Sequence, residues 1–226
     1  MIGLLAASLF LAGASYFDVK TAGEAIPLSF LKAWFASSII YAAYSAYVLL
    51  KADSLLVLQT WGFTIVVSSL IALTLERLRL CGEADCWGLV STTIFNPFLA
   101  LPSFLFAAIA HLAAYAVPLI TLNLMRREKT VPWWAYGWCV RLTPRLLRIP
   151  FVKWRRNPAG QLAMMADAET IRLDARAGDL ASPFLFLLPF YFAAVTLTWL
   201  WPPALTICSW LNIDPATVRW LLEKLP

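Results

Sequence analysis

The stretch CWGLVSTTIFNPFLALPSFLFAAIAHLAAYAVPLITLNLM, from Cys86 to Met125, decides the fold of this chain, because it contains no Asp, Glu, Lys or Arg. It is about twice as long as the roughly 20 apolar residues that a membrane-spanning helix needs. Asn96-Pro97 and Pro102 interrupt the run and favour a tight turn between two helices. The stretch therefore predicts two membrane spans, at about 86–101 and 103–124.

The composition of the whole chain is that of an integral membrane protein. Of its 226 residues, 61% are apolar and only 14% are charged, whereas about a quarter of the residues in ordinary globular domains are charged. The mean hydropathy is +0.73. A chain with so little polar surface cannot coat a water-soluble core, so we predict that it lies in a membrane.

Four further apolar segments have the length of a membrane span or come close to it. They cover residues 1–17, 28–50, 55–75 and 184–201. The first of them has an alternative interpretation as a cleaved signal peptide, which we do not favour because no Lys or Arg precedes its apolar run. Together with the two central spans, these segments predict an all-α integral membrane protein with six transmembrane helices.

The distribution of basic residues predicts the orientation in the membrane. If the amino terminus lies outside, the inside loops contain the basic stretch from Arg126 to Arg176, and the outside segments contain only Lys51, Arg219 and Lys224. This distribution satisfies the positive-inside rule. We therefore expect a multi-pass protein of the cytoplasmic membrane.

One sizeable polar region, residues 126–181, precedes the last predicted span. Its first part, 126–156, interleaves Trp and Tyr with Lys and Arg, a pattern typical of segments bound to an anionic lipid surface. No nucleic-acid-binding motif accompanies these basic residues, and a short strand pair is predicted around 170–173. The chain thus divides into a five-helix membrane region (1–125), a cytosolic or interfacial segment, and the last helix with an amphipathic tail (182–226).

Few side chains in the sequence are suited to catalysis. The single histidine, His111, falls in the middle of a predicted span, where a helix–helix hydrogen bond is a better interpretation than a metal site. The four cysteines form no CxxC pair, and for Cys81 and Cys86 we favour reduced thiols over a disulfide. The GxSxG, HExxH and phosphate-binding glycine motifs do not occur. No metal or other cofactor is therefore expected.

Two aspartates lie where predicted spans meet polar residues. Asp18 directly follows the first span and Asp85 precedes the fourth, so the predicted topology puts both carboxylates at the cytosolic face. Each also has a structural interpretation. Asp85 suits the N-cap of a helix, and Asp18 suits an interfacial ion pair with Lys20. Taken alone, neither aspartate indicates catalysis.

Three short motifs, in this order and spacing, resemble those of the archaeal prepilin and pre-archaellin peptidases, which are six-span aspartic proteases of the GxGD type. The first is Asp18-Val19-Lys20, after the first span. The second is Gly82-Glu83-Ala84-Asp85, at the start of a later span. The third is the proline-bracketed apolar segment Ser182–Pro189. The resemblance implies that Asp18 and Asp85 form a catalytic pair, supported by the neighbouring motif residues Lys20, Gly82 and Ala84.

The same resemblance implies a substrate and a reaction. It implies an endopeptidase that cleaves the short basic leader from prepilin- or pre-archaellin-type signal peptides at the cytosolic membrane surface. The chain lacks the double CxxC of relatives that also N-methylate the product, so cleavage alone is implied. Glu24 and Glu83 are the candidates for contacts with basic leader residues. The second glycine of the motif is Ala84 here, and alanine resists a positive φ before the aspartate.

Two other functions are compatible with the sequence. A small transporter or channel could use Asp18 and Asp85 to bind a cation or relay protons. No charged residue lies at the centre of a predicted span, however, and the inverted symmetry common in transporters is not visible. A non-catalytic scaffold would use the basic stretch as its docking surface. A cleavage assay with purified protein separates the three functions.

Overall fold

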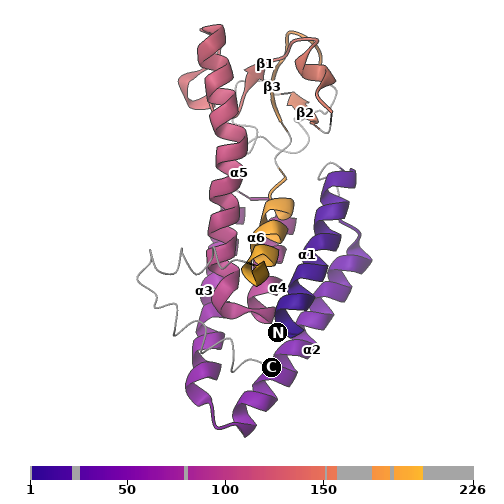
Figure 1. Ribbon diagram of the computed structural model, residues 1–226, viewed down its shortest axis with the longest axis vertical. Helices are drawn as coiled ribbons and strands as arrows, with labels where there is room; N and C mark the ends of the chain where they lie inside the picture. The colour runs from indigo at the N-terminus through magenta and orange to yellow at the C-terminus, as the bar shows by residue number, and fades with distance from the viewer. Residues whose placement is uncertain are drawn as a thin grey trace. The chain divides into compact units, whose positions relative to one another are not determined.

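The computed structural model describes residues 2–21, 26–78, 81–150, 152–156, 175–183 and 186–200 (Figure 1). Its elements, in chain order, are α1 (Ile2–Thr21), α2 (Leu28–Lys51), α3 (Leu55–Arg77), α4 (Glu83–Phe95), α5 (Pro97–Arg126), the 3-10 turn η1 (Trp133–Ala135), β1 (Val140–Arg141), the 3-10 turn η2 (Leu146–Arg148), β2 (Trp154–Arg156), β3 (Leu180–Pro183) and α6 (Leu188–Leu200). They fall in two compact units: a helical unit, Met1–Ala108 with Phe186–Pro226, and a sheet unit, Ile109–Leu185.

Among the described residues, four helices are long and apolar enough to cross a membrane: α1, α2, α3 and the part of α5 from Leu99 to Arg126. The prediction of a mostly helical membrane protein is therefore confirmed. α4 and the described α6 have 13 residues each, or about 20 Å at the rise of an α-helix. That is shorter than the roughly 30 Å hydrocarbon core of a bilayer. The predicted total of six spans is not confirmed.

The predicted break in the long uncharged stretch is present, but it lies at Asn96, and Pro102 continues α5. Pro97 is the first residue of α5, where its missing N–H costs nothing, and it disfavours a helical conformation in the residue before it. Asn96 accordingly has φ −150° and ψ 82°. Its N–H donates to the Thr92 carbonyl at 2.8 Å, and its carbonyl accepts from the Ala100 N–H at 3.1 Å. Both backbone polar groups of Asn96 are thus satisfied, which suits a buried corner in a membrane protein.

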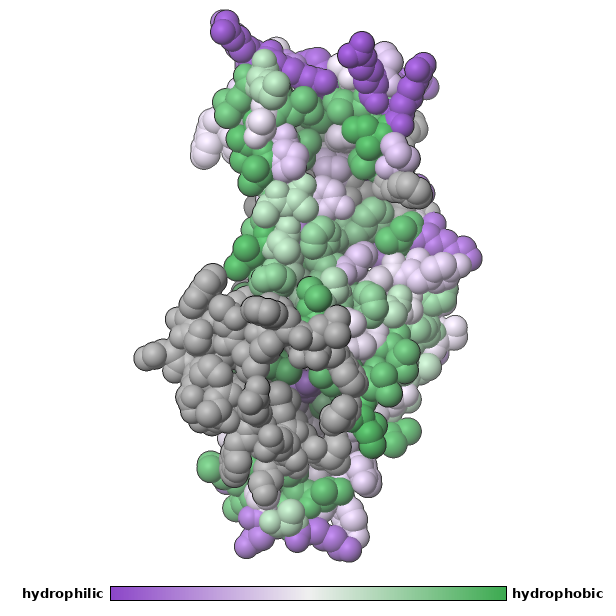
Figure 2. Space-filling view, viewed as in Figure 1, coloured by the Kyte–Doolittle hydropathy of each residue, from purple (hydrophilic) through white to green (hydrophobic). Residues whose placement is uncertain are grey.

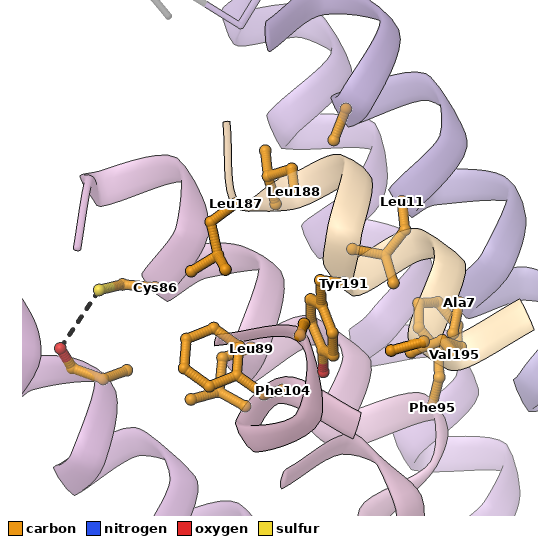
Figure 3. Close-up of a cluster of buried hydrophobic side chains, with 14 of the residues drawn as sticks. Ala7, Leu11, Cys86, Leu89, Phe95, Phe104, Leu187, Leu188, Tyr191 and Val195 are labelled. Atoms are coloured by element: carbon orange, nitrogen blue, oxygen red, sulfur yellow. Dashed lines mark hydrogen bonds between the residues drawn. The ribbon is translucent and has the colours of Figure 1, made fainter. Parts of the chain in front are cut away.

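The core of the helical unit joins α1, α4 and α6 with the first turns of α5 (Figure 3). Leu11, Leu89, Leu188 and Tyr191 are almost fully buried in it. The Tyr191 hydroxyl donates to the Ala100 carbonyl at 3.1 Å, which ties α6 to the start of α5. These contacts pack α4 against its neighbouring helices and hold it in place although it is short.

Small residues allow the helices of this unit to approach closely. A Cβ added to Gly3 of α1 would lie 2.3 Å from the Phe95 carbonyl oxygen at the end of α4. A Cβ added to Gly88 would lie 3.1 Å from Leu188 and 3.6 Å from Trp34. Glycine at helix contacts of this kind is a usual device for packing membrane helices.

The sheet unit contains a three-stranded antiparallel sheet in the order β1-β3-β2, with Val140 paired to Ala181 and Arg155 paired to Ser182. This sheet was not predicted from the sequence. Its predicted strand pair around 170–173 lies outside the described residues, as do Glu24 and the predicted amphipathic tail after the last helix. The mostly helical character of the fold matches the prediction, the six predicted spans are not confirmed, and the sheet is an addition.

Candidate active site

The position of Asp18 follows from the packing of α1. Ala7, Leu11, Ala14 and Asp18 are spaced by four, three and four residues, so they lie on one face of the helix. The first three are fully buried in the core, and Asp18 is 9% exposed. Asp18 is therefore the polar end of the core-facing stripe of α1, with its carboxylate turned toward the interior of the helical unit.

Asp85 is the third residue of α4 and not its N-cap, which corrects the structural interpretation made from the sequence. The helix begins at Glu83, and Gly82 is the N-cap, with φ −71° and ψ 158°. The Gly82 N–H donates to Asp85 Oδ2 at 3.2 Å. A carboxylate at this position reaches back to satisfy an N–H at the helix start, as Glu and Gln do in a capping box.

The alanine in the second glycine position of the motif fits its site without strain. Ala84 lies within α4 and has ordinary helical backbone geometry. Among the described residues, positive φ values occur at Asp53, Arg127 and Gly178. The loop before Asp85 therefore makes no demand for a glycine at position 84, and the steric conflict foreseen from the sequence does not arise.

The two aspartates influence one another electrostatically. The pKa of Asp85 is raised to about 7, first because burial penalises its charged form and second because the negative charge of Asp18 opposes ionisation. The hydrogen bond from the Gly82 N–H works in the opposite direction and lowers this pKa. α1 and α4 thus bring together two carboxylates that are far apart in the sequence, and Asp85 is partly protonated at neutral pH.

Two cysteines flank Asp85, and both are free thiols. Cys86 donates from Sγ to the Ala72 carbonyl at 3.3 Å, which joins the start of α4 to α3 (Figure 3). Burial, helped by the nearby charges of Asp85 and Cys86, raises the pKa of the Cys81 thiol to about 12. A thiolate nucleophile at Cys81 is therefore disfavoured at neutral pH, and the carboxylates are the groups of this site suited to proton transfer.

The other predicted site residues lie near the surface. Lys20 is exposed, and its Nζ lies 5.4 Å from the centre of the Tyr16 ring. Glu83 is also exposed, and it accepts a hydrogen bond from Trp87 Nε1 at 3.3 Å. Glu83 is thus one turn or less from Asp85 and open to solvent, which is where a contact with a basic peptide would need to be.

Other chemistry has less support in this structure. His111 lies in α5, in the sheet unit, with its ring centre 5.0 Å from that of Tyr115. Among the described residues, no three His, Cys, Asp or Glu side chains form a group that could hold a metal ion. The contact of Cys86 with α3 was not predicted from the sequence. The signal available for it was the four-residue spacing from Cys86 to the partly buried Val90 and the buried Ile94 on one side of α4.

Comparisons with known proteins do not identify a relative. No protein-family model, no curated protein and no solved structure matches the chain. The candidate site therefore rests on its own geometry and electrostatics.

Proposed function

We propose that this chain is a membrane aspartic endopeptidase that removes the short basic leader from prepilin- or pre-archaellin-type signal peptides. The observation that carries the proposal is the raised pKa of Asp85, caused first by burial and second by the charge of Asp18 on a different helix. Two neighbouring carboxylates with different proton affinities are the arrangement that aspartic proteases use. The active site is proposed to face the cytosol.

The raised pKa assigns different roles to the two carboxylates. Below a pH of about 7, Asp85 holds the proton of the pair, so it is proposed as the general acid. Asp18 is then the ionised partner and the general base. A general acid with a pKa near the working pH transfers protons most efficiently. The Gly82 N–H holds Asp85 in place during the reaction.

The proposed reaction uses water as the nucleophile. Asp18 takes a proton from the water as its oxygen attacks the carbonyl carbon of the scissile peptide bond, and Asp85 donates its proton to the carbonyl oxygen. When the carbon–nitrogen bond breaks, Asp18 returns its proton to the departing amine. Asp85 recovers a proton from the hydroxyl group as the new carboxyl group forms. Both carboxylates then have the protonation states in which they began.

The position of the pair suits a substrate with a leader next to an apolar helix. Asp18 lies in the last turn of α1 and Asp85 in the first turn of α4, where the apolar runs end. Cleavage at such a boundary would leave the apolar helix of the product intact. We propose that Glu83, exposed beside the pair, attracts the basic residues of the leader, and that Glu24 assists it.

A cleavage assay tests this function. Purified protein is mixed with a substrate that carries a basic leader and an apolar helix, and the products are identified by mass spectrometry. The expected result is one cut on the leader side of the helix, with an unmethylated amine at the new terminus. Substrate with its leader lysines replaced by glutamine should be cut more slowly, whereas the same exchange after the apolar helix should have little effect. Folded protein that cuts no such substrate would falsify the proposal.

The transporter function gives a different result in the same preparation. A transporter would leave the substrate intact and would move cations or protons across vesicles, and this movement would depend on Asp18 and Asp85. The protease function predicts cleavage without such movement.

A further inference from the structure

We infer that the sheet unit docks on an anionic lipid surface through an exposed loop, residues 145–150 with 152–153, called the docking loop below. This inference is independent of the proposed protease function. It rests on how α5 carries the sheet unit, on the rigid exposure of apolar side chains in the docking loop, and on the charge of the unit.

α5 is longer than a membrane span requires. Its 30 residues make a helix about 45 Å long, about 15 Å more than the hydrocarbon core. The end at Pro97 is buried in the helical unit, whereas the other end bears the exposed Arg126 and is followed by the exposed Arg127 and Lys129. The excess, roughly ten residues of an upright helix, therefore lies at the Arg126 end.

The sheet unit is built on this same end of α5. Asn123 donates from Nδ2 to the Tyr136 and Cys139 carbonyls, at 2.9 and 2.7 Å. The chain packs back along the helix as far as Ala116, which lies 3.6 Å from the place where Gly137 would carry a Cβ. The unit is thereby fixed beside the last turns of α5, a helix long and apolar enough to span a membrane.

The docking loop is a rigid structure and not a loose connection. Leu147 and Ile149 donate their N–H groups to the carbonyls of Thr143 and Leu146, both at 3.1 Å. Leu146 is buried against Trp154, whose Nε1 also donates to the Leu146 carbonyl at 3.1 Å. With Leu146 turned inward, this geometry turns two large apolar side chains outward: Leu147 is 36% exposed and Ile149 is 40% exposed.

Cations surround these apolar side chains. Arg145, Arg148 and Lys153 belong to the docking loop, and all three are exposed. Figure 2 shows hydrophilic side chains gathered at the end of the sheet unit, with hydrophobic ones beside them. Basic residues alternating with exposed aliphatic ones match the layer where lipid phosphates meet acyl chains.

The sheet unit as a whole is strongly positive. Its described residues include ten basic side chains and two acidic ones, a difference of +8; the basic ones are Arg126, Arg127, Lys129, Arg141, Arg145, Arg148, Lys153, Arg155, Arg156 and Arg176. Both acids are engaged with arginines. Glu128 pairs with Arg141 at 3.4 Å, and Asp179 pairs with Arg156 at 3.6 Å. The cations of the docking loop thus face no acidic partner among the described salt bridges, and a polyanionic surface complements them.

A membrane suits this surface better than a nucleic acid does. Nucleic acids bind through phosphate contacts and stacking on aromatic rings, whereas the docking loop exposes aliphatic leucine and isoleucine. The loop also belongs to the unit built on the end of α5, which is long and apolar enough to span a membrane, so we expect a lipid surface close to it. Each Lys or Arg near an anionic surface strengthens binding about fivefold, so three of them contribute roughly a hundredfold.

The test measures the depth of the docking loop in full-length protein reconstituted in vesicles. A nitroxide is attached at Ile149→Cys in a background without native cysteines, and its collisions with oxygen and with a water-soluble nickel complex are compared. In vesicles of phosphatidylcholine with phosphatidylglycerol, we expect the label to lie in lipid. It should move into water in pure phosphatidylcholine or at high salt, because salt screens charges beyond a few ångströms. A photocrosslinking residue at position 149, read out by its lipid adducts, replaces the label if the cysteine-free protein does not fold.

Two charge variants decide the outcome. The triple change R145Q, R148Q and K153Q should move the label into water in anionic vesicles, with roughly a hundredfold loss of docking. The matched triple K32Q, K51Q and R77Q removes as many charges from the helical unit and should leave the label in lipid. A label that stays in water in anionic vesicles, or that responds to both triples alike, overturns the inference. The inference is also overturned if added RNA, and not phosphatidylglycerol, shields the label from the nickel complex.

Discussion

Burial raises the pKa of Asp85, in the first turn of α4, and the negative charge of Asp18, in the last turn of α1, raises it further. The relationship depends on two helix faces. The stripe of α1 that ends at Asp18 contains Leu11, and α4 carries the buried Leu89 one turn after Asp85. Because Leu11 and Leu89 belong to the same core, the packing that forms the fold also brings the carboxylates together.

The first prediction concerns the catalytic pair. Asp18→Asn and Asp85→Asn keep the size of the side chain but remove its ability to exchange a proton. Acid–base catalysis by one group typically raises a reaction rate by about 10²–10⁴-fold. The cleavage rate of each variant should therefore fall by at least a factor in this range. The double variant should be little worse than either single one, because the two groups act as a unit. Initial rates on the leader-bearing substrate provide the measurement.

Glu76→Gln is the matched control for these variants. Glu76 is an exposed carboxylate in the last turn of α3, outside the pair. Most of the activity should survive its replacement. Full activity in a folded Asp85→Asn protein would mean that Asp85 serves only the start of α4, since asparagine can also accept the hydrogen bond from Gly82.

The second prediction concerns the pH dependence of activity. Asp85 must be protonated to act as the general acid, and its pKa is about 7. Cleavage should therefore decline as the pH rises through about 7. The pH dependence of kcat/KM measures this decline for the free enzyme. A rate that is constant from neutral to alkaline pH would contradict the assigned role.

The third prediction concerns stability, and its sign follows from the raised pKa. Asp85 ionises near its ordinary value of 3.8 in the unfolded chain and only near 7 in the folded protein. Folding therefore favours the protonated form of Asp85. The protonated side chain contributes to the free energy of unfolding at low pH, and this contribution is lost as the pH rises from about 4 to about 7. Thermal unfolding in detergent should show this loss. Asp85→Asn should flatten that part of the pH profile.

The fourth prediction concerns the motif alanine. Ala84→Gly introduces the second glycine of the GxGD motif that the sequence resembles, yet Ala84 already has helical geometry. We expect no gain in cleavage rate, and a loss of helix stability of up to about 1 kcal/mol, because glycine is a poor helix former. Unfolding midpoints and initial rates measured on the same preparations test both parts. A large increase in rate would show that the loop needs a backbone conformation that alanine does not reach.

The fifth prediction concerns helix packing. Gly3→Ala places a Cβ 2.3 Å from the Phe95 carbonyl oxygen, so α1 and α4 must separate. We expect the unfolding free energy to fall by about 1–3 kcal/mol, the usual cost of overpacking. Gly62→Ala in α3 is the control, since nothing lies within 4 Å of its added Cβ. That variant should be as stable as the parent or slightly more so. Equal losses in the two variants would contradict the close approach at Gly3.

Local patterns in the sequence were sufficient for the helices and for the two aspartates. The apolar runs located α1, α2, α3 and most of α5, whereas the corner was expected near residue 102 and lies at Asn96. Asp18 and Asp85 stood out because they end such runs. The partnership between them was available only through the resemblance, since no local pattern specifies which helix faces meet.

The sheet could not be predicted in this way. Its strands have two to four residues, too few to show an alternation of apolar and polar side chains. They also pair across long separations, as Val140 does with Ala181. The start of α4 was misplaced for a related reason. Asp and Gly both serve as N-caps, so the sequence does not show which of the two precedes the helix. In the structure Gly82 is the N-cap, and its N–H donates to Asp85 within the helix.

The short α4 and its buried corner at Asn96 also constrain how the protein is assembled. With 13 residues, α4 is too short to be retained in the bilayer by itself, and an isolated corner would expose backbone polar groups to lipid. We therefore expect α4 and α5 to insert together as a hairpin, after α1 is in place to receive them at Gly3. Asp85 would then approach Asp18 only when the α4–α5 hairpin inserts. A nascent chain would pass through the translocation machinery without a working site, and the proposed proteolytic activity would begin when biogenesis is complete.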